Sequence, residues 1–258
     1  MADEGLDRRS FLKGAAALGT TIAATNVSGQ NSEKKEAKKE AVPNGQKIIG
    51  RPGSDFMVDV IKSTGIEYIA SNPASSFRSL HESLVNYGGN RKPEFLTCMH
   101  EESSVAMAHG YAKASGKMMG VLVHGTVGLQ HASMALYNAW CDRVPIMVMA
   151  GNFMDAAQRR PGVEWYHCVQ DPAGIVRDFI KWDDQPSSLQ HFAESTIRAY
   201  KMAMTPPMEP VMITADGMLQ EHPIEDEAKL VIPKLHLSAP PTGEPRSEER
   251  RVGKECRL

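Results

Sequence analysis

The sequence predicts an α/β fold in which a parallel β-sheet carries helices on both faces. The apolar runs 119–123 and 145–150 are short and uninterrupted, which is typical of strands that are buried on both sides. Between such runs lie segments whose apolar residues recur at helical spacing, and this alternation favours parallel strands joined by helices. A length of 258 residues fits one large domain with tails.

The first predicted element is a helix over 54–65, in which Ser54 is the candidate N-cap and Gly65 the stop. A strand over 67–70 leads into the polar turn 72–76, and a second helix ends at Gly88. The apolar stripe of this second helix consists of Phe77, Leu80, Leu84 and Val85. The later elements are a strand over 94–99, a helix over 101–115 closed by Gly116, a strand over 119–123, a helix with Leu129, Ala132, Leu136 and Trp140 on one face, a strand over 145–150, a strand near Ile180, a helix over 188–204 and a strand over 211–214.

Composition narrows the functional classes. The chain is 41% hydrophobic and 23% charged, which excludes a wholly disordered protein. In residues 48–245, acidic side chains outnumber basic ones by 22 to 16, and this argues against binding to a nucleic-acid backbone. The cysteines Cys98, Cys141, Cys168 and Cys256 contain no C-x-x-C pair, so they predict scattered buried thiols rather than a zinc site or a disulfide framework.

Residues 1–30 resemble a twin-arginine export signal, because R-R-S-F-L-K is followed by a weakly apolar stretch. That stretch, 14–24, is shorter than the roughly 20 residues that cross a bilayer, so no membrane span is expected. We therefore expect export to the periplasm or another extracytoplasmic compartment, although a chance basic pair stays open. Residues 31–47 alternate in charge and lack an apolar face, which indicates a solvated linker.

The C-terminal region is predicted to lie outside the domain. A Pro-rich break covers 238–245, and residues 246–258 read R-S-E-E-R-R-V-G-K-E-C-R-L without apolar periodicity. This run resembles the translation of a sequencing adapter, which would make the tail non-native and the chain a fragment of a longer gene product. A natural basic tail is the alternative.

Three turns follow the carboxyl ends of predicted strands, at 72–76, 99–102 and 124–128. Ligands bind at this edge of parallel sheets. Glu101 opens a helix, where an acid also compensates the helix dipole, and His124 is either a structural or a functional histidine. The run H-E-E-S-S at 100–104 does not match the H-E-x-x-H zinc motif, and the turn at 124–128 lacks the third glycine of a dinucleotide motif.

Three stretches resemble the N-terminal, pyrimidine-binding domain of thiamine diphosphate enzymes, the group that contains acetolactate synthase, benzoylformate decarboxylase and pyruvate decarboxylase. Residues 98–117 are similar to the pattern H-E-x6-A-x-G-Y-A-x-A-[ST]-G around the family's cofactor glutamate. Residues 122–151 resemble the benzoylformate decarboxylase branch in L-V-H and A-L-Y-N-A-W. Residues 72–75, N-P-A-S, are similar to the family's N-P-G-S turn. The resemblance implies a pyrimidine-binding domain over 48–237.

The resemblance also implies roles for particular residues. Glu101 would bind the cofactor by hydrogen-bonding the pyrimidine N1′, which favours the tautomer that takes the proton from C2 of the cofactor, and we expect it in an apolar site. Pro73 and Gly128 would also contact the cofactor. His124 would move protons in catalysis and contact substrate, and Ser75 would bind the substrate carboxylate. Gly110 and Tyr111, on the helix that begins at Glu101, would let the chain pack closely.

Some features depart from the family's pattern. The turn 125–128, G-T-V-G, is bulkier than the family's small-residue turn, and His131 replaces an asparagine. The family binds the diphosphate through Mg²⁺ on a C-terminal domain that carries G-D-G and a later asparagine. The one Asp-Gly pair here, at Asp216, has no asparagine after it, so we interpret it as the end of the last strand and not as a metal ligand.

The resulting hypothesis is the pyrimidine-binding half of a thiamine diphosphate-dependent decarboxylase or carboligase that acts on a small 2-oxo acid. It would be incomplete as given, with Mg²⁺ bound by a missing C-terminal domain, and it would work as a homodimer or homotetramer. An acetolactate synthase-like transferase is one alternative, and a non-catalytic subunit that pairs with a separate diphosphate-binding chain is another. A stand-alone ligand-binding protein would instead bind its ligand tightly without magnesium.

Overall fold

The computed structural model describes residues 50–152 and 167–237. The chain divides into two compact units, Met1–Lys47 and Ile48–Leu258, and all described residues belong to the second. The predicted export signal, charged linker, Pro-rich break and C-terminal tail lie outside the described residues, so they stay predictions.

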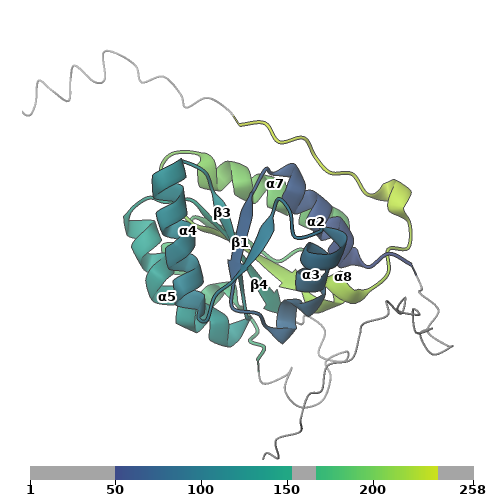
Figure 1. Cartoon of the computed structure of the whole chain (residues 1–258), viewed down its shortest axis with the longest axis horizontal. Coiled ribbons are helices and arrows are strands. Elements are labelled where there is room, and N and C mark those ends of the chain that lie inside the picture. Colours follow the sequence, from purple (N-terminus) through teal and green to yellow (C-terminus); the bar gives the residue numbers. More distant parts are fainter. Residues whose placement is uncertain (1–49, 153–166, 238–258) are drawn as a thin grey trace, which may run out of the picture. The chain divides into compact units, whose positions relative to one another are not determined.

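Six strands form one sheet in the order β2-β1-β3-β4-β6-β5 (Figure 1). Every neighbouring pair is parallel, which confirms the predicted fold class. The strands are β1 (Tyr68–Ser71), β2 (Glu94–Thr97), β3 (Met119–Val123), β4 (Ile146–Asn152), β5 (Trp182–Asp184) and β6 (Val211–Asp216). The prediction for β3 is correct to the residue, whereas β5 begins two residues after Ile180, where a strand was expected.

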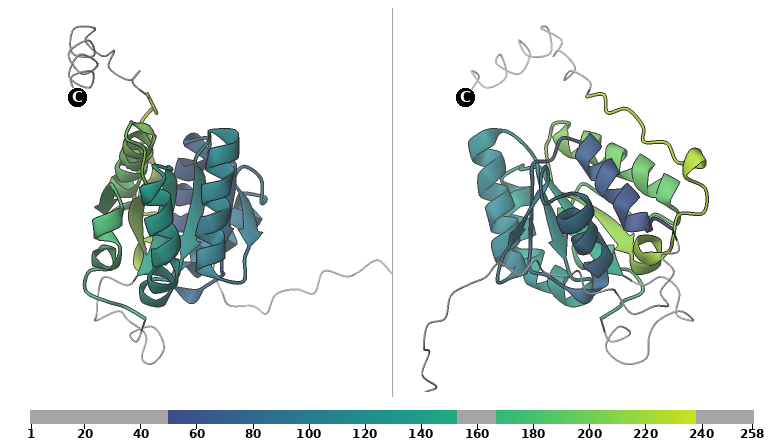
Figure 2. Two further views of the ribbon diagram at one scale, coloured as in Figure 1. Left: turned by 90° about the vertical axis from the view of Figure 1, so that its left-hand side faces the viewer. Right: turned by 45° about the vertical axis from the view of Figure 1, so that its right-hand side comes forward.

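Helices cover both faces of this sheet, as predicted. They are α2 (Gly53–Ser63), α3 (Arg78–Glu82), α4 (Glu101–Ser115), α5 (Thr126–Cys141), α7 (Leu189–Met204) and α8 (Gly217–Glu221), with short turns η1 (Ser75–Phe77), η2 (Ser83–Tyr87, π-helical), η4 (Ala173–Ile175), η5 (Arg177–Phe179) and η6 (Glu227–Lys229). Figures 1 and 2 show α4 and α5 on one side of the sheet and α2, α3, α7 and α8 on the other. Among the residues that the structure describes, no helix combines the length and apolar character needed to cross a membrane.

The sheet separates two hydrophobic cores, and β4 contributes to both. Ile146 and Val148 belong to the core beneath α4 and α5, whereas Met147 and Met149 belong to the core beneath α2 and α7. Successive side chains of a strand point to opposite faces, so a strand between two helical layers must be apolar at every position. All seven residues of β4 are buried, which explains its continuous apolar sequence.

The carboxyl edge of the sheet has a switch point between β1 and β3. These strands are neighbours, but the chain leaves β1 through η1 and α3 on one face and leaves β3 into α5 on the other. The two connections therefore diverge, and open α/β sheets bind ligands in the crevice that such a divergence creates. The fold places the turns after β1, β2 and β3 around this point.

The start of α2 differs from the prediction. The helix begins at Gly53 with Pro52 as its N-cap residue, so the assignment of Ser54 as N-cap is wrong. Ser54 is buried in the helix, and its hydroxyl accepts a hydrogen bond from Ser83 Oγ at 2.7 Å. A Cβ on Gly53 would lie only 2.0 Å from the carbonyl oxygen of Leu219, so the sequence needs glycine where α8 crosses α2. Sequence analysis did not predict α8.

Two other burial predictions also need correction. Val85 is 38% exposed although Leu84 is buried, because one residue turns a helix by about 100° and carries the next side chain away from the core. Cys141 is exposed at the end of α5, so the expectation of scattered buried thiols is wrong there, whereas Cys98 is buried.

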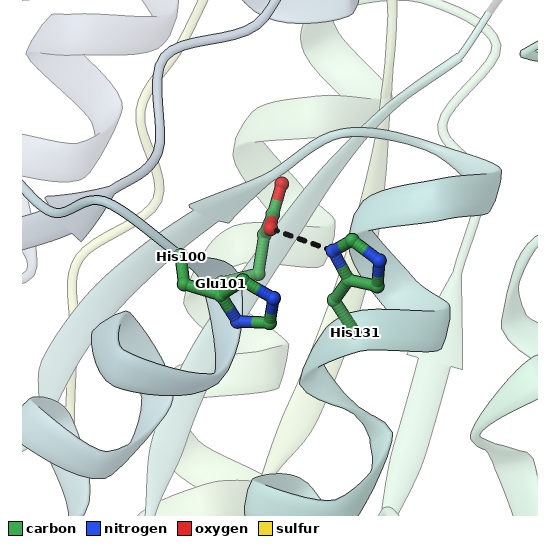
Figure 3. A group of neighbouring side chains, drawn as sticks. All are labelled: His100, Glu101 and His131. Carbon is green, nitrogen blue, oxygen red and sulfur yellow. Dashed lines mark hydrogen bonds and ion pairs between the residues drawn. The ribbon is translucent and has the colours of Figure 1, made fainter. Parts of the chain in front are cut away.

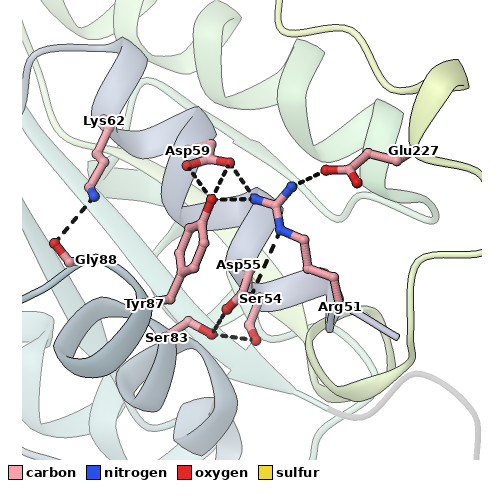
Figure 4. A network of polar contacts seen from close by, with 9 residues as sticks. All are labelled: Arg51, Ser54, Asp55, Asp59, Lys62, Ser83, Tyr87, Gly88 and Glu227. Atoms are coloured by element: carbon pink, nitrogen blue, oxygen red, sulfur yellow. Dashed lines mark hydrogen bonds and ion pairs between the residues drawn. The ribbon is translucent and has the colours of Figure 1, made fainter. Parts of the chain in front are cut away.

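Arg51 lies at the centre of a polar network beside α2 (Figure 4). Its guanidinium donates to the carboxylates of Asp59 and Glu227 and to the hydroxyl of Tyr87, the last at 2.7 Å. Its Nε lies 3.8 Å from Asp55. The guanidinium carbon stands 4.9 Å from the centre of the Tyr87 ring. One permanent cation thus links α2 to η2 and η6.

Candidate functional site

Glu101 is the first residue of α4 and lies at the carboxyl edge of the sheet, directly after the loop that follows β2. The residue is 4% exposed. Its Oε1 accepts a hydrogen bond from Asn72 Nδ2, in the loop after β1, at 3.3 Å. Its Oε2 lies 3.3 Å from Nδ1 of His131 on α5. The expectation that Glu101 lies in an apolar site is therefore wrong. The loop after β1 places an amide on one side of the carboxyl group, and α5 places an imidazole on the other.

His100 and His131 are stacked beside this carboxyl group (Figure 3). Their ring centres are 4.6 Å apart and their planes differ by 13°. His100 is the N-cap of α4, and its Nδ1 accepts a hydrogen bond from the Glu102 backbone N–H at 3.3 Å. The His131 side chain is 55% exposed, so the cluster opens to solvent on its α5 side.

Gly128 brings two of the predicted site residues together. A Cβ at this position would lie 3.2 Å from Glu101 Oε1 and 3.0 Å from the Cβ of His124. A larger residue would press on the Glu101 carboxyl group, so glycine keeps the α5 side of that group uncovered. The structure therefore gathers Glu101, Gly128 and His124 around the start of α5.

His124 follows β3 directly, and its protonation is set by its neighbours. The Gly125 backbone N–H donates to His124 Nδ1 at 2.9 Å, so the neutral ring carries its proton on Nε2. Its ring stacks on His167, with centres 4.6 Å apart. Burial lowers the pKa of His124 from the ordinary 6.5, the adjacent His167 lowers it further, and Glu101 partly offsets these effects. His124 is therefore neutral at pH 7.

The N-P-A-S turn holds its two predicted site residues at the surface. Pro73 and Ser75 are both exposed, and Ser75 begins η1. The neighbouring Ser76 is buried and its hydroxyl has no hydrogen-bond partner within the described segments; Asn152 Oδ1, at the end of β4, is also buried and unpartnered there. Neither residue was expected at the site from the sequence: Ser76 ends the predicted turn 72–76, and Asn152 lies two residues beyond the predicted strand 145–150.

The interpretation of Gly110 as a site of close packing is wrong. Gly110 is exposed, and a Cβ there would have no atom within 4 Å. Tyr111 does pack, since its ring meets Tyr68 edge to face with centres 5.5 Å apart and its hydroxyl donates to Glu67 at 3.2 Å. The Gly-Tyr pair thus contributes a contact to β1 through the tyrosine alone.

Asp216 ends β6, as predicted, and is buried. Its Oδ1 accepts a hydrogen bond from the Met218 backbone N–H at 2.8 Å and so caps α8. This contact gives the Asp-Gly pair a structural role in the fold.

The charge around Glu101 distinguishes it from Glu209, another buried acid of the domain. Within the described residues, His131 is its one ion-pair partner, and that partner is charged only when protonated. Glu209, by contrast, faces the permanent charge of Arg143. A buried carboxyl group without a permanent cation can hold a proton, accept a hydrogen bond from a ligand or coordinate a metal ion. In the sequence, Asn72 was marked by the turn after β1, and His131 by its place where the family has an asparagine.

Comparisons with known proteins match the part of the chain that contains this cluster. Residues 51–170 match the family "Thiamine pyrophosphate enzyme, N-terminal TPP binding domain". The acetolactate synthase large subunit of Lactococcus lactis is 26% identical over 195 residues, which cover 74% of this chain and 32% of that protein. Benzoylformate decarboxylase of Pseudomonas aeruginosa is 26% identical over 156 residues, which cover 60% of this chain and 28% of that protein.

A solved structure shows the same fold. The crystal structure of benzoylformate decarboxylase from Polynucleobacter necessarius superposes with a TM-score of 0.65 at 18% identity, over 80% of this chain and 36% of that one. The chain spans about a third or less of the length of these curated relatives. Residues 51–170 thus match the N-terminal TPP binding domain of thiamine pyrophosphate enzymes, and the chain is similar to acetolactate synthase and benzoylformate decarboxylase.

Proposed function

We propose that this chain supplies the pyrimidine side of a thiamine diphosphate site in a 2-oxo-acid decarboxylase or carboligase. The observation that carries the proposal is Glu101, a carboxyl group that is 4% exposed at the switch point of the sheet. Gly128 places no side chain against its Oε1, and no permanent cation pairs with the carboxyl group among the described residues. These properties fit a carboxyl group that hydrogen-bonds a heterocyclic nitrogen.

The residues present fit the cofactor on its pyrimidine side. Glu101 would hydrogen-bond N1′ of the ring, while Pro73 and Gly128 would flank it. When bound, thiamine diphosphate supplies the carbon that attacks the 2-oxo group and takes up the charge left by decarboxylation. Asn72 holds Glu101 Oε1 in place through the hydrogen bond from its side-chain amide.

His124 would hold and move a proton at Nε2. The Gly125 N–H fixes Nδ1 as an acceptor, and burial keeps the ring neutral at pH 7, so Nε2 offers a proton to a substrate oxygen. The exposed hydroxyl of Ser75 would bind the carboxylate of the 2-oxo acid. A histidine at position 124 leans the proposal toward a decarboxylase; the match to acetolactate synthases keeps a transferase as the second candidate.

The proposal extends beyond the described residues. The diphosphate and Mg²⁺ would be held by polypeptide other than residues 50–152 and 167–237, and the site would be completed in a homodimer or homotetramer. Export by the twin-arginine route would deliver the folded protein with its cofactor.

The test compares Glu101→Gln with Glu102→Gln in the enzyme that contains the diphosphate-binding part. Glu102 is the adjacent, exposed acid in the first turn of α4, so its substitution matches the change in helix-terminal charge. Glu101→Gln should lower kcat/KM for 2-oxo-acid decarboxylation by about 10²–10⁴-fold, because glutamine cannot share the proton, while Glu102→Gln should change it less than about threefold. Wild-type turnover in Glu101→Gln, or an equal loss in both variants, would remove Glu101 from the mechanism.

A further inference from the structure

The geometry points to a second use of the Glu101 cluster: His100, Glu101 and His131 form a site for a divalent transition-metal ion such as Zn²⁺. One nitrogen from each histidine and one carboxylate oxygen lie within 4.8 Å of one another. The three side chains come from two elements, the start of α4 and the middle of α5, and Figure 3 shows both rings beside the carboxylate. This inference stands without the proposed cofactor.

The distance between two of the candidate ligand atoms is close to that expected around a bound metal ion. Zn²⁺ binds nitrogen and oxygen at about 2.0–2.1 Å, so two ligands at a tetrahedral angle are about 3.4 Å apart. His131 Nδ1 and Glu101 Oε2 are 3.3 Å apart, which already matches such an edge. The His100 ring lies nearly parallel to that of His131, with centres 4.6 Å apart, so it must rotate out of this stack before its in-plane lone pair points at the same ion.

The ligand set favours a transition metal over magnesium. Imidazole nitrogen suits zinc, iron and copper, whereas Mg²⁺ prefers oxygen ligands. Two histidines with one carboxylate are typical of sites that keep an open position for water or substrate. The exposed side of His131 leaves such a position open to solvent.

Charge also favours a cation. The buried Glu101 carboxylate has no permanent cationic partner among the described residues, so a bound metal would neutralise it. The positive end of α4, where His100 and Glu101 lie, opposes a cation, but this effect is small beside direct coordination.

Metal binding would change the proton positions of both histidines. His100 Nδ1 now accepts the Glu102 N–H at 3.3 Å, and this long contact is lost whether Nδ1 binds the metal or Nε2 binds it and Nδ1 takes the proton. His131 would coordinate through Nδ1 and carry its proton on the solvent side. A metal on Glu101 would also exclude a hydrogen bond from that carboxyl group to a pyrimidine nitrogen, so zinc would inhibit the enzyme of the proposed function.

The experiment measures Zn²⁺ binding to the 258-residue chain near neutral pH, by calorimetry and by competition with a chromophoric chelator. We expect one Zn²⁺ per chain and no binding of Mg²⁺. His131→Asn should weaken zinc binding at least about tenfold, because it removes a ligand from an exposed position that the fold does not need. Glu101→Gln should weaken it by at least as much.

His109→Asn is the matched control. His109 also lies on α4 beside a carboxylate, Asp142 at 3.0 Å, but Lys113 shares that carboxylate, and no second histidine from the described part of the chain stacks there. This variant should keep wild-type affinity, and Co²⁺ in place of zinc should give a visible spectrum without thiolate charge transfer. Absence of zinc binding at micromolar metal, a loss below tenfold in His131→Asn, or an equal loss in His109→Asn would overturn the proposal.

Discussion

The carboxylates of this domain meet two different kinds of partner, as the Arg51 network and the Glu101 cluster show (Figures 3 and 4). Asp59 faces a guanidinium whose charge is permanent, and its carboxylate accepts a further hydrogen bond from the Tyr87 hydroxyl at 3.0 Å. Glu101 is more deeply buried, yet its contacts are an amide and an imidazole at 3.3 Å. Glu101, the carboxyl group that is more costly to bury, therefore has the weaker polar contacts.

The contrast separates polar groups with a permanent charge partner in the fold from a buried group without one. Arg51 ties α2 to later segments and fixes the charge of its partners. The Glu101 contacts are an amide and an imidazole, and they leave the carboxyl group without a permanent cationic partner among the described residues. We therefore expect the Arg51 network to raise the free energy of unfolding and the buried Glu101 carboxyl group to lower it.

The largest effect on stability is expected for Gly53→Ala, beside the Arg51 network. Its Cβ would lie 2.0 Å from the Leu219 carbonyl oxygen, so α2 and α8 must separate. The free energy of unfolding, measured with urea, should fall by about 3 kcal/mol. Gly110→Ala in α4 is the control, because nothing lies within 4 Å and alanine favours a helix; it should gain about 0.5–1 kcal/mol. A Gly53→Ala protein as stable as wild type would contradict the close approach of α8.

The second prediction compares Arg51→Met with Glu101→Gln. Methionine keeps the aliphatic bulk but leaves Asp55 and Asp59 without their cation, so the free energy of unfolding should fall by about 1–2 kcal/mol, and less at high salt. Glu101→Gln removes a buried charge that lacks a permanent partner, so stability should equal or exceed that of wild type. Urea unfolding of both proteins tests this, and a larger loss in Glu101→Gln would reverse the comparison.

The smallest effect is the pH dependence contributed by His124. Burial and His167 lower its pKa in the folded state, so below pH 6.5 the unfolded chain binds more protons than the native protein and stability falls. His124→Gln should lose stability less steeply between pH 6.5 and pH 5, while the two proteins run parallel above pH 7. Burial also lowers the pKa of His81, but that group is present in both proteins and cancels. Parallel curves below pH 6.5 would show that the folded-state pKa of His124 is not lowered.

Local sequence determined most of the elements of this domain. The helix over 101–115 and the strand over 119–123 are predicted to the residue, because Gly116 takes φ of 72° after the helix and the strand is apolar on both faces. The start of α2 was misplaced, because Leu219, far along the chain, decides which residue fits there. Capping and periodicity act over a few residues, whereas such a contact acts across the fold.

By itself, the sequence determined the alternation of strands and helices and the position of Glu101 at the head of α4. Only the tertiary structure decided that Asn72 and His131, 29 and 30 residues away, both meet that carboxyl group, and that two pairs of histidines stack beside the switch point. The physical reason is that strand order and helix placement depend on burying two cores at once. The partners of a side chain at the sheet edge follow from that packing, which helix and strand periodicity do not encode.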